Sequence, residues 1–192
     1  MGENSTTRRR ALIGGGGALV GALAVVGSAA PAAAGDNGEE LDAAAIRQLS
    51  INYAIGTDAV SRGDLDTARA RYQASFTPDA TIGAGFDPAA PALTAQGPEE
   101  WLGVVAQAFE PYTATQHLLG TIDVVFPDGP GRRRQASMST YLNATHVLAA
   151  TKELSTVLGT YFDEVELIDG SWRIVDRFLQ FTSFETSPRT LP

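Results

Sequence analysis

The sequence predicts an α+β domain with helices packed on one face of an antiparallel sheet. Two observations support this prediction: apolar residues recur at helical spacing up to about residue 110, and long segments of alternating polarity follow from Thr115 onward. A third observation is the pair Asp169-Gly170, a strong hairpin signal between the last two of these segments. When helices precede a meander of strands, the sheet can curl around the helices and leave a pocket between the two layers.

Three segments have the pattern of amphipathic helices. The first ends near Arg62-Gly63, and its apolar residues recur at helical spacing at Leu41, Ala45, Ile46, Leu49, Tyr53, Gly56 and Val60. The second runs from Leu65 to about Ala74, with Asp64 as its N-cap. The third opens at Pro98-Glu99-Glu100, because proline and acidic residues favour the first turn of a helix. Its apolar face holds Trp101, Leu102, Val105, Ala108 and Phe109.

Five segments have the pattern of strands. A short strand over residues 80–86 follows the break at Pro78-Asp79, and a loop rich in proline, alanine and glycine is expected over residues 87–97. Four longer strands are expected at about 115–126, 135–150, 156–168 and 172–184. Residues 127–131 join the first two of these four as a hairpin loop.

Residues 1–34 have the composition of an export signal and are left out of the predicted fold. Paired arginines, within Arg8-Arg9-Arg10, precede an uncharged stretch from Ala11 to Ala30, and Pro31 and three alanines then form a small-residue cleavage signal before Gly35. The four glycines at residues 14–17 lower the apolarity, which favours cleavage over spanning a membrane. We therefore expect an exported protein, periplasmic, in the cell envelope or secreted. An uncleaved N-terminal membrane anchor stays open as the alternative.

The composition excludes several classes of function for the remaining domain, residues 35–192. Residues 1–34 hold three of the 14 basic and one of the 22 acidic residues, so the domain carries a net charge of −10. This charge argues against nucleic acid and against anionic membranes as partners. The chain has no cysteine, which rules out disulfides, thiolate catalysis and cysteine-ligated metals.

The two histidines of the chain, His117 and His146, lie in matching contexts within two predicted strands. Alternation places His117 on one face with Thr115, Leu119 and Thr121, and it places His146 on one face with Met138, Leu142 and Leu148. Further along the chain it groups Tyr161 with Asp163 and Val165, and Trp172 with Ile174, Asp176 and Phe178. Two histidines on neighbouring strands can act on one bound molecule as an acid–base pair. Two separate structural histidines are the alternative.

Other candidate site residues lie on the first helix. Asp58 is a carboxylate on an otherwise apolar helix, either buried and suited to acid–base chemistry or simply exposed. Tyr53 projects from the apolar face, where core packing with a tethered hydroxyl is the simpler reading. Two histidines and one carboxylate could form a facial triad for iron, but no His-x-x-x-His spacing occurs. We expect no metal and no cofactor.

Several short motifs of the chain resemble one superfamily. They are Tyr53…Asp58…Gly63-Asp64-Leu65-Asp66, Phe76-Thr77-Pro78-Asp79-Ala80, Thr115-Gln116-His117 and Asp169-Gly170-Ser171-Trp172-Arg173-Ile174. Their order and spacing over about residues 40–184 resemble the nuclear transport factor 2-like superfamily, and within it the SnoaL-like and scytalone dehydratase-like branch. The resemblance implies one domain with a cone-shaped, curved, mixed sheet wrapped around three N-terminal helices and enclosing a pocket. The superfamily contains enzymes and binders, so its fold does not settle a function.

The resemblance also implies roles for individual residues. In scytalone dehydratase two pocket histidines on adjacent strands are catalytic, and their positions match His117 and His146 here. The adjacent tyrosine and aspartate of that enzyme fall on Val60 and Ser61, with Asp58 one turn earlier as a substitute. Its second tyrosine falls near Ala84, and a hydrogen-bonding asparagine falls at Tyr161. These departures imply a related reaction on a different substrate.

From this evidence the sequence predicts a cofactor-independent dehydratase acting on a small apolar hydroxylated or carbonyl compound. His146, with Asp58 as its partner, would remove a carbon-bound proton, and His117 would protonate the leaving hydroxyl. Substrate-binding side chains would be Tyr53, Trp101, Met138, Leu142, Tyr161 and Phe178. An isomerase or cyclase of the same fold, or a non-catalytic binder of small hydrophobic ligands, is the alternative, and histidines more than about 8 Å apart would favour the binder. A dimer or trimer stays open.

Overall fold

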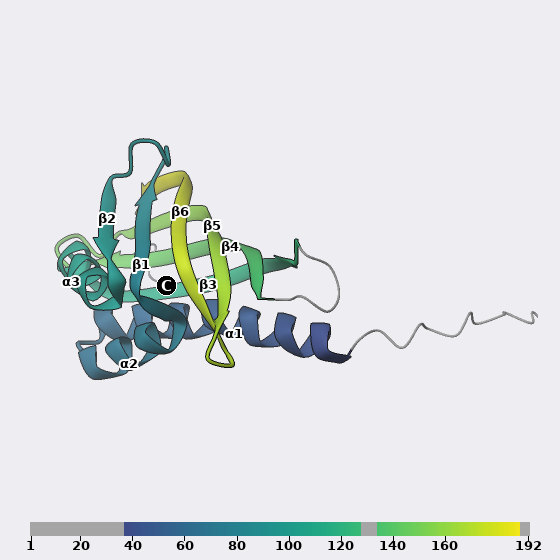
Figure 1. The fold of residues 1–192 in the computed structure, drawn as a ribbon. Coiled ribbons are helices and arrows are strands. Elements are labelled where there is room, and N and C mark those ends of the chain that lie inside the picture. The colour runs from purple at the N-terminus through teal and green to yellow at the C-terminus, as the bar shows by residue number, and fades with distance from the viewer. Residues whose placement is uncertain (1–36, 128–133, 189–192) are drawn as a thin grey trace, which may run out of the picture. The chain divides into compact units, whose positions relative to one another are not determined.

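A computed structural model describes residues 37–127 and 134–188 (Figure 1). The predicted export signal and most of the predicted hairpin loop at 127–131 lie outside these residues. Within the described part, no helix combines the length and apolarity needed to cross a membrane.

The helices confirm the sequence prediction in number and order. They are α1 (Asn37–Ser61), α2 (Leu65–Ser75) and α3 (Gly97–Phe109). Asp64 caps α2, since its carboxylate accepts a hydrogen bond from the peptide N–H of Thr67 at 3.1 Å. At the start of α3 the carboxylate of Glu100 accepts a hydrogen bond from the peptide N–H of Gln96 at 2.9 Å. Local capping chemistry therefore sets both boundaries.

The strands form one six-stranded mixed sheet. They are β1 (Phe76–Gly85), β2 (Leu93–Gln96), β3 (Tyr112–Val125), β4 (Gln135–Leu148), β5 (Leu154–Ile168) and β6 (Ser171–Ser187). The sheet has the order β2-β1-β6-β5-β4-β3, in which only β1 and β6 are parallel. The expected meander of the last four strands is confirmed. Asp169 (φ 49°) and Gly170 (φ 76°) both adopt the left-handed backbone that a two-residue hairpin requires.

Strand β2 lies within the segment that the sequence predicts to be a loop. It is four residues long and pairs with β1 at the edge of the sheet, from Thr81↔Gln96 to Ala84↔Leu93. The proline-rich and alanine-rich composition around it carries no strand signal, so only the pairing with β1 reveals it. The prediction of a loop over 87–97 is therefore wrong at its second half.

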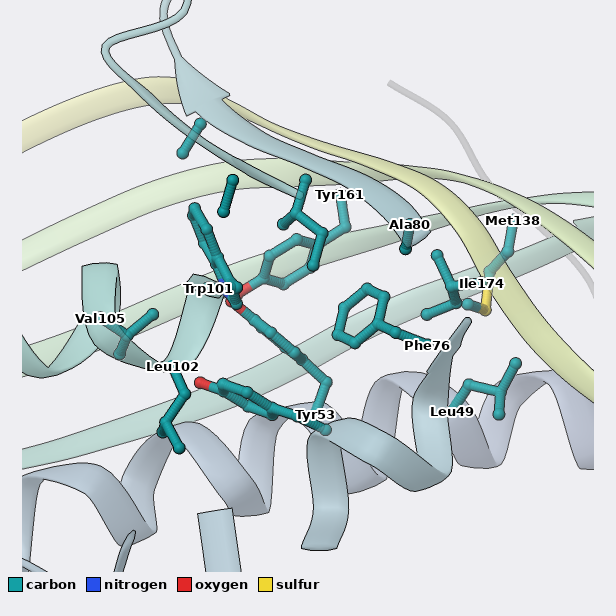
Figure 2. Close-up of a cluster of buried hydrophobic side chains, with 14 of the residues drawn as sticks. Leu49, Tyr53, Phe76, Ala80, Trp101, Leu102, Val105, Met138, Tyr161 and Ile174 are labelled. Carbon is teal, nitrogen blue, oxygen red and sulfur yellow. The ribbon is translucent and has the colours of Figure 1, made fainter. Parts of the chain in front are cut away.

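The core lies between the three helices and the concave face of the curved sheet (Figure 1). Ile46 of α1, Phe76 and Ile82 of β1, and Ile174 of β6 are all at most 2 % exposed. Figure 2 shows Leu49 of α1 and Met138 of β4 on either side of Ile174 in this layer. Helices on one face of a sheet bury the apolar half of each strand, as the alternation of the sequence predicts.

Several bulges shift this alternation, and two of them each overturn a prediction. In β3 the register slips between Leu119 and Ile122, so Ile122 faces the core while Thr121 is exposed rather than sharing the face of His117. In β6 the pairing shifts between Val165↔Ile174 and Glu164↔Asp176. Asp176 is consequently exposed, and the next residue, Arg177, faces the core at 2 % exposure. A bulge inserts one residue, and every side chain after it changes face.

Candidate functional site

A cavity of about 210 Å³ lies between the sheet and helices α1 and α3. Side chains from every helix and strand except α2 line it, and most of them are apolar or aromatic. An apolar cavity of about 150 Å³ is large enough to hold benzene. The present cavity therefore suits a compact organic molecule somewhat larger than one aromatic ring.

His117 lines this cavity and is held by Asp58, which comes from the end of α1. The Nδ1 atom of His117 lies 2.7 Å from Oδ1 of Asp58, and the peptide N–H of His117 donates to Oδ2 at 3.2 Å. The side chain of His117 is 5 % exposed and that of Asp58 19 %. Because the carboxylate accepts at Nδ1, it favours the tautomer with the proton there and leaves Nε2 as the basic nitrogen.

The surroundings of Asp58 keep its carboxylate ionised. Burial on its own would raise the pKa of Asp58, but the hydrogen bonds and the charge interaction of His117, with the hydroxyl of Thr115, bring that pKa below its ordinary value. The Thr115 hydroxyl donates to Oδ1 at 3.0 Å and also lies 3.0 Å from the hydroxyl of Ser61. The carboxylate is thus fixed by three donors and free to orient the imidazole.

His146 lies beside His117 on the same side of the sheet. The two ring centroids are 5.6 Å apart with the planes almost perpendicular, below the separation of about 8 Å that would favour the binder alternative. Phe109 packs against both rings, at 6.1 Å from His117 and 5.3 Å from His146. Tyr112 also packs against His146, at 4.8 Å, and contacts Phe109 at 6.1 Å. The two imidazoles therefore share one aromatic enclosure at the cavity wall.

The partner of Asp58 differs from the prediction. We expected Asp58 to pair with His146, and the structure pairs it with His117. Among the described residues, Nδ1 of His146 has no hydrogen-bond partner. Burial, and next the neighbouring imidazole of His117, lower the pKa of His146 from 6.5 to about 4. His146 is therefore neutral at pH 7.

This pKa shift predicts a pH-dependent stability. The unfolded chain binds a proton at His146 near pH 6.5, whereas the folded chain binds it only near pH 4. Stability from the neutral form is therefore fully present above pH 6.5 and is lost as the pH falls toward 4, by up to about 3 kcal/mol. Urea unfolding at pH 7.5 and 4.5 should show a smaller loss in His146→Leu than in the wild type. Equal losses in the two proteins would contradict this assignment.

The predicted substrate-binding residues divide into two groups. Tyr53, Trp101, Leu142 and Tyr161 all line the cavity. The indole N–H of Trp101 donates to the hydroxyl of Tyr53 at 2.9 Å, and Figure 2 shows Tyr53, Trp101 and Tyr161 turned toward one another from α1, α3 and β5. These four residues are therefore placed to contact a ligand beside the two histidines.

Met138 and Phe178 do not line the cavity. Met138 is a core residue at 2 % exposure whose sulfur accepts a weak hydrogen bond from the hydroxyl of Ser50. Phe178 follows the bulge in β6 and lies opposite Phe162, which is 47 % exposed on the outer face of the sheet. Because the bulge reverses the alternation, Leu179 and Phe181 face the cavity where simple alternation predicts Phe178.

The sequence pattern missed part of the aromatic lining. Phe109, Tyr112, Phe181 and Phe184 all belong to the cavity, yet the pattern singles out only Phe109, as a residue on the apolar face of a helix. Tyr112 lies at the very start of β3, before the predicted strand begins. Phe181 lies beyond the first bulge in β6, where the period-two signal has changed face, and Phe184 lies beyond a second shift of register, between Gly159↔Phe181 and Leu158↔Ser183. An alternation pattern that allows one-residue bulges could have suggested Phe181.

No three histidine, cysteine or carboxylate side chains of the described residues are grouped closely enough to hold a metal ion. The two histidines and Asp58 thus do not assemble as the facial triad considered above. The chemistry open to these residues is proton transfer between His117 and a molecule in the cavity.

Comparison with known proteins places this geometry among related folds. A family model described as the SnoaL-like domain matches residues 39–177. No curated protein matches the chain. A hexachlorocyclohexane dehydrochlorinase, LinA type 2, has a similar solved structure with a TM-score of 0.66 and 19% identity, covering 82% of this chain and 98% of that one.

Two further solved structures show the same fold. LinA type 3 from Novosphingobium barchaimii has a TM-score of 0.65 and 18% identity, covering 82% of this chain and 99% of that one. A proposed scytalone dehydratase from Novosphingobium aromaticivorans has a TM-score of 0.61 and 19% identity, covering 80% of this chain and 93% of that one. At these identities the likeness concerns the fold, which confirms the α+β domain with a curved mixed sheet around three helices.

Proposed function

The chain belongs to the SnoaL-like domain family, and from this premise we propose that it is a cofactor-independent lyase that eliminates water from a small, apolar hydroxylated or carbonyl compound. One observation supports the proposal most: Asp58 and His117 form a partly buried carboxylate–imidazole pair, and His117 lines an apolar cavity. A positioned imidazole with a free Nε2 can take a proton from carbon at neutral pH.

In the proposed reaction His117 acts first as base and then as acid. Nε2 of His117 takes the proton, and the C–H electron pair forms the new double bond as the carbon–oxygen bond breaks. The imidazolium that forms is stabilised by Asp58, 2.7 Å from Nδ1, and it returns the proton to the departing hydroxyl, which leaves as water. Atoms and electrons balance without a further reactant.

His146 has a different part in this scheme. With a pKa of about 4 it stays neutral, so one ring nitrogen donates and the other accepts a hydrogen bond. It lies 5.6 Å from His117 between ring centroids, close enough to hold the leaving hydroxyl while His117 protonates it. Tyr53, Trp101, Leu142 and Tyr161 would bind the body of the substrate and exclude water.

The names of the structural relatives are consistent with elimination chemistry. A dehydrochlorinase and a dehydratase each remove a small molecule, HCl or water, across a carbon–carbon bond. An isomerase would use the same pair to move a proton and would keep the hydroxyl. A binder would use the cavity alone. The proton-transfer geometry favours the first two over the third.

A direct assay tests the proposal. Small β-hydroxy ketones, chosen to fit a cavity of about 210 Å³, are incubated with the protein, and the conjugated ketone product is followed by its ultraviolet absorbance and by the loss of water in mass spectrometry. We expect turnover of at least one of them. Mass analysis of ligand co-purified with the protein guides the choice. A co-purified ligand that is bound but neither dehydrated nor isomerised would favour the non-catalytic binding protein.

We propose further that residues 1–34 act as a cleaved twin-arginine export signal. Replacing Arg8 and Arg9 by lysine should retain the precursor in the cytoplasm, because this export route reads the arginine pair specifically. Cell fractionation measures the retention, and mass analysis of the exported wild type should give Gly35 as the first residue. Unchanged export of the variant would contradict the proposal, and an intact N-terminus in the membrane fraction would favour an anchor.

A further inference from the structure

One buried charge has no part in the scheme above. Arg177 of β6 is 2 % exposed and forms a two-pronged ion pair with Asp163 of β5, Nε to Oδ1 at 2.6 Å and Nη2 to Oδ2 at 2.7 Å. Nη2 also donates to the hydroxyl of Ser50 at 3.2 Å, while Nη1 has no partner among the described residues. Neither Arg177 nor Asp163 lines the cavity.

The guanidinium of Arg177 packs against two tyrosine rings that do line the cavity and that contact each other edge to face. Its central carbon is 4.3 Å from the ring centroid of Tyr53 and 4.5 Å from that of Tyr161. A cation against both rings draws electron density from them and makes each phenol a stronger hydrogen-bond donor. Along β5, Val157 and Tyr161 line the cavity, whereas Asp163, two residues after Tyr161, does not. The positive end of the ion pair therefore faces the tyrosines.

Both hydroxyls are protonated and have a proton to offer. Burial raises the pKa of Tyr53 and, more strongly, that of Tyr161, and Arg177 opposes this only in part. The Tyr53 oxygen accepts from the indole of Trp101 at 2.9 Å, so its own proton points elsewhere. The Tyr161 hydroxyl makes no hydrogen bond to any described residue, and it is not among the fully buried polar atoms that lack a partner. Its remaining outlet is the cavity that the ring lines.

We propose that the end of the cavity formed by Tyr53 and Tyr161, with Arg177 buried behind the rings, is a binding site for an uncharged oxygen acceptor, a carbonyl above all. An anionic ligand group is disfavoured there, because the ion pair Asp163–Arg177 is neutral overall and the ionised Asp58 lies behind His117 of the cavity lining. The inference rests on the proposed function in one respect, that a ligand occupies this cavity. It narrows the ligand class to neutral carbonyl compounds.

Two probe molecules of the same shape distinguish the effect of hydrogen bonding on affinity from the effect of shape. Acetophenone has a carbonyl oxygen where α-methylstyrene has a methylene group. One added hydrogen bond of about 1.4 kcal/mol gives a tenfold preference, so wild-type protein should bind acetophenone about tenfold more tightly. The infrared carbonyl stretch of bound acetophenone should shift to lower frequency than in hydrocarbon solvent. Benzoate, the charged analogue, should not bind measurably.

Variants assign the effect to the tyrosines. In Tyr161→Phe the preference should fall to about twofold or less and the infrared shift should shrink, while the melting temperature stays unchanged because this hydroxyl has no protein partner. Tyr72→Phe is the matched control: its hydroxyl contacts Thr57 at 2.8 Å and its ring is not part of the cavity lining. That variant should lose stability and keep the full preference for acetophenone.

The outcomes are decisive for this inference and separate from the proposed reaction. Equal binding of the two probes by the wild type, no binding of either at millimolar concentration, or a preference that survives Tyr161→Phe combined with Tyr53→Phe would each overturn it. His117→Ala should leave the preference intact. A cavity that selects the carbonyl but never moves a proton would uphold the inference and refute the proposed function.

Discussion

Replacing His117 by alanine should lower turnover by roughly 10²- to 10⁴-fold, the usual contribution of a positioned base. The variant loses the only imidazole that Asp58 orients, while the apolar cavity lining stays in place. Binding of a ligand should change little, so the loss should appear in kcat rather than in KM. Steady-state kinetics on the substrate found in the elimination assay measures both.

Three companion variants sharpen this result. Asp58→Asn should fall between His117→Ala and the wild type, because the imidazole remains but loses its ionised partner. His146→Ala should also lower turnover, and its effect combined with His117→Ala should be far from additive, since both act in one proton transfer. Gln116→Ala, an exposed neighbour on the opposite face of β3, should behave as the wild type. A folded double histidine variant with full activity would refute the enzymatic reading.

Replacing Arg177 by methionine should destabilise the fold by about 3–5 kcal/mol, because it leaves the carboxylate of Asp163 buried without its partner. Burial already raises the pKa of Asp163, and the charge and hydrogen bonds of Arg177 oppose this rise. The lost side chain also leaves a gap against the rings of Tyr53 and Tyr161. Urea unfolding followed by far-ultraviolet circular dichroism measures the change.

The same chemical change at Arg173 provides the control. That residue lies on β6 near Arg177 but pairs only with the carbonyl of Trp172, so Arg173→Met should stay within about 0.5 kcal/mol of the wild type. The double variant Asp163→Leu with Arg177→Met should recover most of the loss, since it removes both buried charges. A single Arg177→Met variant as stable as the wild type would contradict the importance assigned to this pair.

Local sequence signals predicted the elements of the fold well. Helical spacing, the N-cap at Asp64 and the turn at Asp169-Gly170 act within a few residues, and the structure bears them out. Alternation correctly placed each histidine on the inner face of its own strand. The register around Thr115↔His146 and His117↔Ala144 brings the two together on one side of the sheet. The resemblance supplied the superfamily and the expectation of a pocket.

The errors have non-local causes. The bulges near Thr121 and Asp176 depend on how β3 and β6 fit their neighbours, and each reverses the faces of the residues that follow it. For this reason Phe178 was expected in the cavity and Arg177 was not expected in the core. The pairing of Asp58 with His117 rather than His146 depends on where α1 crosses β3. No local pattern in the sequence encodes either arrangement.

The central claim is that Asp58 and His117 together remove a proton from the carbon of a bound ligand. Hydrogen–deuterium exchange at carbon tests it directly, because elimination and isomerisation share this first step. The wild type and His117→Gln are incubated in D₂O with a co-purified or screened carbonyl ligand, which is then examined by mass spectrometry. We predict that the wild type either exchanges a carbon-bound hydrogen of the ligand for deuterium or eliminates water from the ligand. The rate of this reaction should be at least about 100-fold lower in the variant. A ligand that binds in the cavity and neither gains deuterium nor loses water with the wild type, or does either equally with the variant, would contradict the claim.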